Sequence, residues 1–273
     1  MSAFVLALAL LAAPAAAQQP KSVTGVEVER SRLLLLPAST VERAAAGQYA
    51  QLMRQAQQKG ALNSDQQQVE RLRGIARELI PHSERFNQDA ARWRWEVNLI
   101  GSKAVNAFCM PGGKIAFFSG ILDSLKLSDD EVAAVMGHEI AHALLEHGRA
   151  RMSEQLLQSV GITVVAAFFN LGQIGTEVLA QAANLALSLP YARKQESDSD
   201  LVGMELAARA GHDPRAAIEV WRKMQAYARA AAKGQPPQFL STHPSHENRI
   251  KEIEAALPRV LPLYEAARKR PAR

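Results

Sequence analysis

The sequence has a single cysteine, Cys109, so no intramolecular disulfide can form and stability must come from packing. Cys109 lies in an apolar run and is expected to be a small buried hydrophobe rather than a nucleophile. The apolar runs are too short to span a bilayer. There is no glycine-rich phosphate loop, no internal repeat and no nucleic-acid-binding motif, so nucleic acid is not an expected partner. The 273 residues are enough for one large domain with a full core.

The N-terminal residues have the pattern of a signal peptide. An apolar run over Phe4–Ala13 is followed by the small-x-small pattern of Ala15 and Ala17. Residues 1–17 are therefore predicted to be removed, and the chain to be exported to a periplasm-like compartment. The missing basic residue before the run departs from the pattern. No cysteine follows the cleavage site, so a lipid anchor there is not expected.

An H-E-x-x-H motif lies on a predicted helix at the centre of the sequence. Ser128 and Glu131 form a capping box that starts this helix. His138 and His142 are four residues apart, so their imidazoles share one face and can bind one Zn²⁺ per chain. Glu139 points elsewhere and can act as general base toward a water molecule. An amphipathic helix with two solvated histidines would give the same local pattern.

A third ligand must come from elsewhere, because neither common spacing is present. Leu145 and Gly148 occupy the positions where one metallopeptidase class has glycine and a third histidine. Thermolysin-like enzymes place a glutamate about twenty residues after the second histidine, where this sequence has Gly161 and Ile162. On a continuous helix, His147 is off the ligand face, and we expect it to be solvated.

Glu196 is the best candidate for the third ligand. It shares one face of a predicted helix with Asp200, which can accept an imidazole N–H or fix a nearby arginine behind the metal. Gly203, two turns on, would let this helix pack closely on the metal helix. The alternative is an acidic first turn that complements the helix dipole.

A small sheet is predicted directly before the metal helix. Trp93–Leu99 alternates apolar and polar residues, as a half-buried strand does. A second strand follows the turn at Pro111–Gly113. We expect this second strand to be an exposed edge to which substrate adds as an extra strand; its residues are Lys114, Ile115, Ala116, Phe117, Phe118 and Ser119.

The remaining sequence is predicted to be mostly helical. Residues 18–60 form an N-terminal helical segment, residues 61–258 the metallopeptidase domain and residues 259–273 a basic, solvated tail. The tail could touch anionic lipid or an acidic partner. Residues 160–174 are expected to form a buried or interface helix, with peripheral membrane contact as the alternative, and residues 176–189 another helix.

Four blocks resemble a family of zinc metallopeptidases that includes the Ste-type CAAX prenyl proteases, HtpX, the mitochondrial Oma-type protease and the periplasmic BepA- and LoiP-like proteases. The blocks are Val105–Phe108 with Pro111–Leu122, His138–His142, Glu196–Gly203 with Gly211–Pro214, and Thr242–Pro244 with Arg249–Ile250. The resemblance implies a mostly helical zincin-like α+β domain, with His138, His142 and Glu196 as ligands and Glu139 as base. Without the family's membrane helices or helical-repeat domain, the sequence is closest to the short, soluble, exported branch, and prenyl-peptide processing is not expected.

The predicted activity is hydrolysis of peptide bonds in misfolded or misassembled envelope proteins. The alternative is a chaperone-like quality-control factor whose metal site is mostly closed by a fourth protein ligand. His243 lies in a loop where the resembling family also has His-Pro, and we expect it to face the zinc site. It could donate to the oxyanion during turnover, or it could occupy the open metal position at rest; the second role is favoured slightly.

Overall fold

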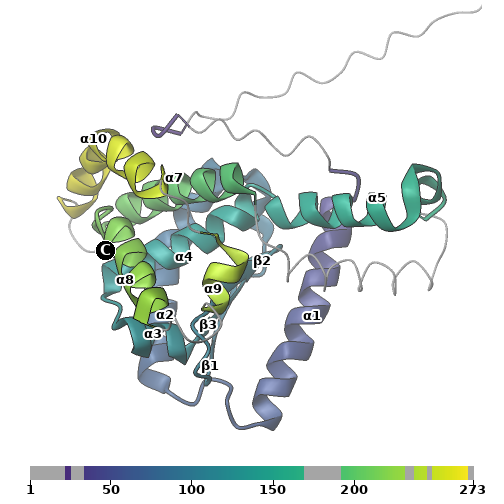
Figure 1. Cartoon of the computed structure of the whole chain (residues 1–273), viewed down its shortest axis with the longest axis horizontal. Helices are drawn as coiled ribbons and strands as arrows, with labels where there is room; N and C mark the ends of the chain where they lie inside the picture. Colours follow the sequence, from purple (N-terminus) through teal and green to yellow (C-terminus); the bar gives the residue numbers. More distant parts are fainter. Residues whose placement is uncertain (1–21, 26–33, 169–191, 231–236, 245–247, 270–273) are drawn as a thin grey trace, which may run out of the picture.

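The computed structural model describes residues 22–25, 34–168, 192–230, 237–244 and 248–269, with the backbone alone for residues 158–168. The predicted signal peptide and the helix expected over residues 176–189 lie outside these residues. Figure 1 shows the arrangement of the elements. In chain order they are α1 Ala38–Gln58, α2 Gln66–Leu79, the short 3₁₀ helices η1 Ile80–Arg85 and η2 Gln88–Arg92, β1 Glu96–Ile100, β2 Ala107–Met110, β3 Lys114–Phe118, α3 Ser119–Leu125, α4 Asp129–Leu144, α5 His147–Phe168, α7 Arg193–Ala210, α8 Ala216–Ala230, α9 Gln238–Thr242 and α10 Asn248–Arg268.

The expected α+β class is confirmed: a small three-stranded sheet is surrounded by helices. Its strand order is β1-β3-β2, with β1 parallel and β2 antiparallel to β3. The prediction that the strand beginning at Lys114 is an exposed edge is therefore wrong, because β3 is central and Ser119 already belongs to α3. Gly112 and Gly113, both at positive φ, form the turn that folds β2 back onto β3. The two edges of the sheet are β1 and β2.

The two faces of the sheet pack on different helices. Ile115 and Phe117 of β3 belong to the main core, with α2 and α4. Ala116, which points the opposite way, packs with residues of α1. Tyr49 of α1 also donates its hydroxyl to the backbone carbonyl of Ile115 at 2.5 Å. The N-terminal helix is thus joined to the sheet that packs against α4.

The first strand starts later than predicted. β1 begins at Glu96, and the two tryptophans before it are half-buried rather than strand residues. The Trp95 indole covers Gly113, where a Cβ would lie 2.6 Å from the ring, and donates Nε1–H to the Ala90 carbonyl. Because Trp95 packs on the β2–β3 turn, it does not continue the alternation of β1.

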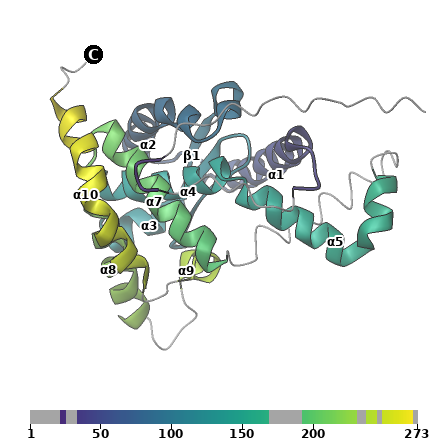
Figure 2. The same ribbon diagram turned by 90° about the horizontal axis from the view of Figure 1, so that it is seen from above.

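Helix α4 crosses α7 at two glycines. A Cβ on Gly203 would lie 2.6 Å from the backbone nitrogen of His138, and a Cβ on Gly137 would lie 2.7 Å from the Gly203 carbonyl oxygen. The close packing predicted for Gly203 is therefore confirmed. It brings α7 against α4, the helix that carries the two histidines, and Figure 2 shows these two helices from above.

The last helix continues past the predicted end at Pro258. α10 runs to Arg268 with Pro258 and Pro262 inside it, so most of the predicted tail is helical. Each proline removes one backbone donor, but Val260 is fully buried in the main core and Leu263 packs against it. Apolar packing on this face outweighs the lost hydrogen bonds.

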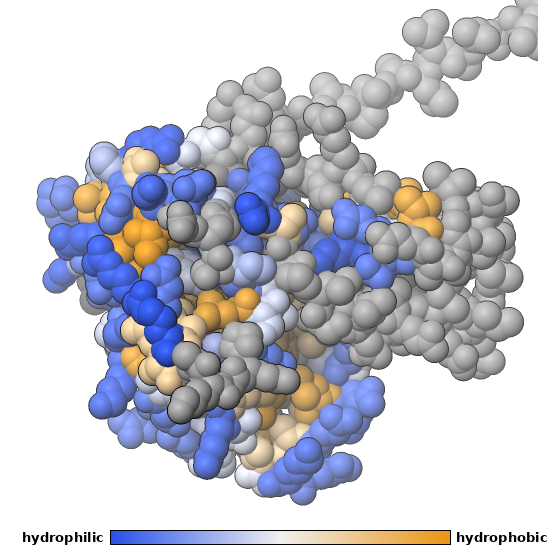
Figure 3. All heavy atoms as spheres, viewed as in Figure 1, coloured by the Kyte–Doolittle hydropathy of each residue, from blue (hydrophilic) through white to orange (hydrophobic). Residues whose placement is uncertain are grey.

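Helix α5 extends away from the other helices in both ribbon views (Figures 1 and 2). Within the described ranges, no helix is both long and apolar enough to cross a membrane. The membrane contact considered for residues 160–174 concerns side chains outside the described residues. Most of the described surface on the face in Figure 3 is hydrophilic.

Candidate metal centre and active site

The two histidines of the motif face each other on α4. The capping box of Ser128 and Glu131 is present, and it fixes the start of the helix two and a half turns before His138. The Nε2 atoms of His138 and His142 lie 3.1 Å apart, and both rings are buried. The predicted spacing thus places two imidazole nitrogens at one point.

Glu196 reaches this point from α7. Its Oε1 lies 3.4 Å from Nε2 of His142, its Oε2 lies 3.6 Å from Nε2 of His138, and the side chain is fully buried. Burial alone would raise the pKa of Glu196, but hydrogen bonds from His142 and His243 outweigh it and hold the pKa well below its ordinary value. The carboxylate is therefore charged.

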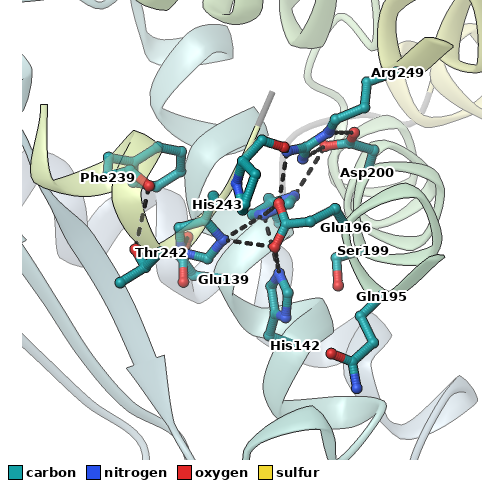
Figure 4. Close-up of polar contacts among 12 residues, drawn as sticks. Glu139, His142, Gln195, Glu196, Ser199, Asp200, Phe239, Thr242, His243 and Arg249 are labelled. Carbon is teal, nitrogen blue, oxygen red and sulfur yellow. Dashed lines mark hydrogen bonds and ion pairs between the residues drawn. The ribbon is translucent and has the colours of Figure 1, made fainter. Parts of the chain in front are cut away.

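His243 is the fourth group at the centre, and it lies just after α9. Its Nδ1 is 3.1 Å from Oε1 of Glu196 and 3.3 Å from Nε2 of His138. The Phe239 ring stacks on the imidazole, with centroids 4.4 Å apart. The expectation that His243 faces the site agrees with this geometry, shown in Figure 4.

These four side chains form a donor set that suits a metal ion. One ligand atom from each of His138, His142, Glu196 and His243 lies within 4.8 Å of all the others, and all four residues are between 0% and 4% exposed. Nitrogen and carboxylate donors are the ligands that Zn²⁺ takes in proteins. A cation among them would compensate a buried carboxylate and separate imidazole nitrogens that otherwise meet at 3.1 Å. The residues present therefore fit a metal.

Asp200 lies behind the centre, between His138 and Arg249. Its Oδ1 is 2.9 Å from Nδ1 of His138. Arg249 of α10 donates to both carboxylate oxygens of Asp200, at 2.6 and 2.8 Å, and to Glu196 at 2.6 Å. Burial would lower the pKa of His138, but Asp200 and Glu196 outweigh that effect and raise it.

Arg249 is the arginine that the sequence alone did not identify in this role. Only 1% of it is exposed, and its guanidinium lies 3.7 Å from the centroid of the Trp221 ring. It also donates to the backbone carbonyl of Pro244, next to His243. The one feature of the sequence that could have pointed to Arg249 is its position six residues after His243, in the same polar block.

Glu139 of α4 lies beside the metal centre and contacts the sheet edge, because it is close both to His243 and to the backbone of Cys109. The backbone N–H of Cys109 in β2 donates to its carboxylate, and burial raises its pKa above the ordinary value. Its Oε1 has no hydrogen-bond partner among the described residues, although Nε2 of His243 lies 3.4 Å away. A buried carboxylate oxygen of raised basicity is suited to accept a proton from water.

The prediction that His147 is solvated is wrong. α4 ends at Leu144, Glu146 has φ +57°, and α5 starts at His147. On a continuous helix His147 would point about 140° away from His142, but the break turns it back, and the two Nδ1 atoms lie 3.0 Å apart. Burial lowers the pKa of His147 to about 3, so the ring is neutral.

Comparison of the sequence with known proteins finds relatives of this chain. The chain is 37% identical to the mitochondrial metalloendopeptidase OMA1 of Schizosaccharomyces pombe, over 60% of this chain and 47% of that protein. It is 31% identical to the Beta-barrel assembly-enhancing protease of Escherichia coli, over 56% of this chain and 32% of that protein. The chain thus matches less than half the length of these relatives.

The family model extends over most of the described domain. Residues 66–257 match the model of peptidase family M48, and this range includes the H-E-x-x-H helix, Glu196, His243 and Arg249. All four donors of the metal centre lie within the matched range. The chain belongs to peptidase family M48, a family of metallopeptidases.

Proposed function

We propose that this chain is a zinc-dependent endopeptidase that cleaves polypeptides with Glu139 as its general base. The observation that carries the proposal is the buried set of four donors, three of which are the predicted ligands His138, His142 and Glu196. Zinc is proposed because two imidazoles and one carboxylate are its usual ligands in hydrolytic sites.

The residues of the chain have separate roles in this reaction. When bound, zinc supplies Lewis acidity, which acidifies water and polarises a carbonyl oxygen. Glu139 takes a proton from the attacking water and returns it to the leaving amine. Arg249 and Asp200 keep Glu196 and His138 in place through the contacts described above.

The edge strand β2 is the proposed docking site for substrate. Asn106 accepts from Phe118, so its carbonyl faces β3, and by alternation Val105, Ala107 and Cys109 direct their backbone groups outward. The Cys109 N–H already points to Glu139. A peptide added to this edge would therefore pass beside the base, which replaces the docking on β3 expected from sequence.

A closed resting state is supported by α9. Phe239 donates its backbone N–H to Val105, one of the outward-facing carbonyls, while His243 lies at the metal centre. We propose that His243 is a fourth ligand at rest and that α9 must move before substrate binds. This arrangement would also suit the alternative function, a chaperone-like factor with a mostly closed site.

The proposed substrates are misfolded or misassembled envelope proteins, and the proposed location is outside the cytoplasm. The sequence pattern of residues 1–17 supports export. One relative is named for enhancing β-barrel assembly, which supports a role in the envelope, whereas others are named as mitochondrial.

The test compares the wild-type chain with Glu139→Gln for metal content and for casein digestion. We expect about one zinc per chain in both, and a loss of hydrolysis of at least about a hundredfold in the variant, because an amide cannot accept the proton. Glu196→Ala should lose the metal itself. Full zinc and full activity in Glu196→Ala would show that the ligand assignment is wrong.

A further inference from the structure

His147 has no role in the reaction described above, yet it is buried against one of the proposed ligands. It is 4% exposed, and its Nδ1 lies 3.0 Å from Nδ1 of His142 and 3.4 Å from the hydroxyl of Ser199 in α7. Its position depends on the break between α4 and α5, where Glu146 takes a left-handed conformation that a side chain rarely adopts. The unfavourable backbone conformation of Glu146 therefore accompanies the placement of the His147 ring against His142.

The hydrogen bond between the rings of His142 and His147 has one donor, and the donor follows from which nitrogen of His142 faces the metal centre. Nε2 of His142 points to Nε2 of His138 and to Glu196. A neutral imidazole that offers Nε2 to a metal carries its proton on Nδ1. With a metal bound at Nε2, Nδ1 of His142 is therefore the donor and Nδ1 of His147 the acceptor, so the proton of His147 lies on its Nε2.

The two histidines on α4 therefore have different supports. Nδ1 of His138 faces the carboxylate of Asp200 at 2.9 Å. Nδ1 of His142 faces a neutral imidazole instead. Groups behind a metal ligand fix the tautomer and the orientation of its ring, and their loss typically weakens metal binding.

We propose that His147 is a positioning residue that holds His142 in the tautomer and orientation needed to bind the metal. The proposal rests on the proposed metal site, but it concerns the support of one ligand rather than catalysis. It predicts that what matters at position 147 is a hydrogen-bond acceptor, not only a side chain that fills the space.

Two variants separate these properties. His147→Phe keeps a planar ring but offers no acceptor, whereas His147→Gln offers a carbonyl oxygen. Zinc dissociation constants would be measured by competition with a chelator on the full chain. We expect the Phe variant to bind zinc about 10- to 100-fold more weakly than the wild type, and the Gln variant to stay within about threefold.

Unfolding of the zinc-free proteins in urea provides the control for structural damage, and the midpoints of the wild type and both variants should agree. Nitrogen-15 NMR of the histidine rings should show Nε2 of His147 protonated and Nδ1 unprotonated. Equal zinc affinity in His147→Phe and wild type, or equal weakening in both variants, would overturn the proposal.

The proposed endopeptidase function can be refuted independently of the proposal for His147. If the wild type binds zinc but cleaves no casein, the endopeptidase activity is refuted while the comparison at position 147 stays decisive. A wild type that takes up no zinc would refute both.

Discussion

At the scale of single residues, the site depends on a buried network of charges rather than on the motif alone. Arg249 pairs with Glu196 and Asp200 at the same time, so one positive charge is shared between two carboxylates, and the guanidinium also lies over the Trp221 ring. A buried ion pair that loses one partner leaves an uncompensated charge, which costs about 3–5 kcal/mol. The proposed ligand Glu196 is therefore positioned by α10 as well as by its own helix.

His243→Ala tests whether the fourth donor closes the site. If His243 is a ligand at rest, its removal should raise casein hydrolysis severalfold and weaken zinc binding, because an open position is gained and a donor is lost. If His243 donates to the oxyanion instead, kcat should fall by about a hundredfold with zinc retained. Casein hydrolysis and zinc affinity distinguish the two roles.

Thr242→Ala is the matched control for this substitution. Thr242 precedes His243 in α9 and its hydroxyl bonds only to carbonyls of the same helix among the contacts described. It should leave activity within about twofold, since it removes no group from the centre. Equal activity and zinc affinity in His243→Ala and wild type would exclude both roles.

Local spacing predicted the residues on α4 and failed where the helix breaks. His138 and His142 follow from a four-residue repeat, which any regular helix satisfies. The prediction for His147 was wrong because no residue pattern indicates the left-handed backbone conformation of Glu146. Contacts made across a break depend on one backbone angle, which residue patterns do not determine.

At the scale of elements, the site exists because α4 and α7 come unusually close. Gly137 and Gly203 face each other at the crossing, and the atoms nearest to the added Cβ positions are backbone atoms. Backbone cannot move aside as a flexible side chain can. The distance between the α4 histidines and Glu196 is therefore set by these glycines.

Gly203→Ala should separate the two helices. We expect a loss of about 1–3 kcal/mol in the free energy of unfolding, as in other overpacked cores. Zinc affinity should also fall, because Glu196 moves away from the histidines together with α7. Urea unfolding and chelator competition measure the two effects.

Gly47→Ala in α1 is the control, because among the described residues no atom outside the nearby backbone of α1 lies within 4 Å of the added Cβ. It should leave zinc binding unchanged and stabilise the protein by up to about 1 kcal/mol through helix propensity. If Gly203→Ala behaves like this control, the glycine contact does not set the helix spacing.

The edge of the sheet could not be predicted from the strands themselves. Both β2 and β3 are short and apolar, and either would be suitable as an edge strand by composition. The order is decided by β1, which precedes them and pairs in parallel with β3. Such non-local pairing leaves no periodic signal, whereas the class of fold and the helix ends at Ser128 and Gly211 do.

At the scale of the whole molecule, the described N-terminal residues are attached to the helix that carries Glu196. Glu205 of α7 is fully buried and accepts from the hydroxyl of Ser22 and the backbone N–H of Val23, while Arg209 donates to its other oxygen. A buried carboxylate with these partners joins residues that are 183 positions apart in the sequence.

Glu205→Gln should weaken this attachment and lower stability by about 2 kcal/mol, because hydrogen bonds to a charged group are lost. Urea unfolding measures the loss of stability, and limited proteolysis near Ser22 measures how far the N-terminal residues detach. Glu219→Gln provides a control, since Glu219 forms an exposed pair with Arg222 that contributes less than about 1 kcal/mol. Similar losses in the two variants would show that the N-terminal contact is unimportant.

The solitary thiol gives the protein a built-in reporter of opening. Cys109 is buried in the core between β2 and α4, its pKa is raised by burial, and its own N–H holds Glu139. A thiol reagent can react there only when strand and helix part, and no second cysteine adds background. The labelling rate of the unmodified chain therefore measures how often β2 and α4 separate beside Glu139, without any engineered probe.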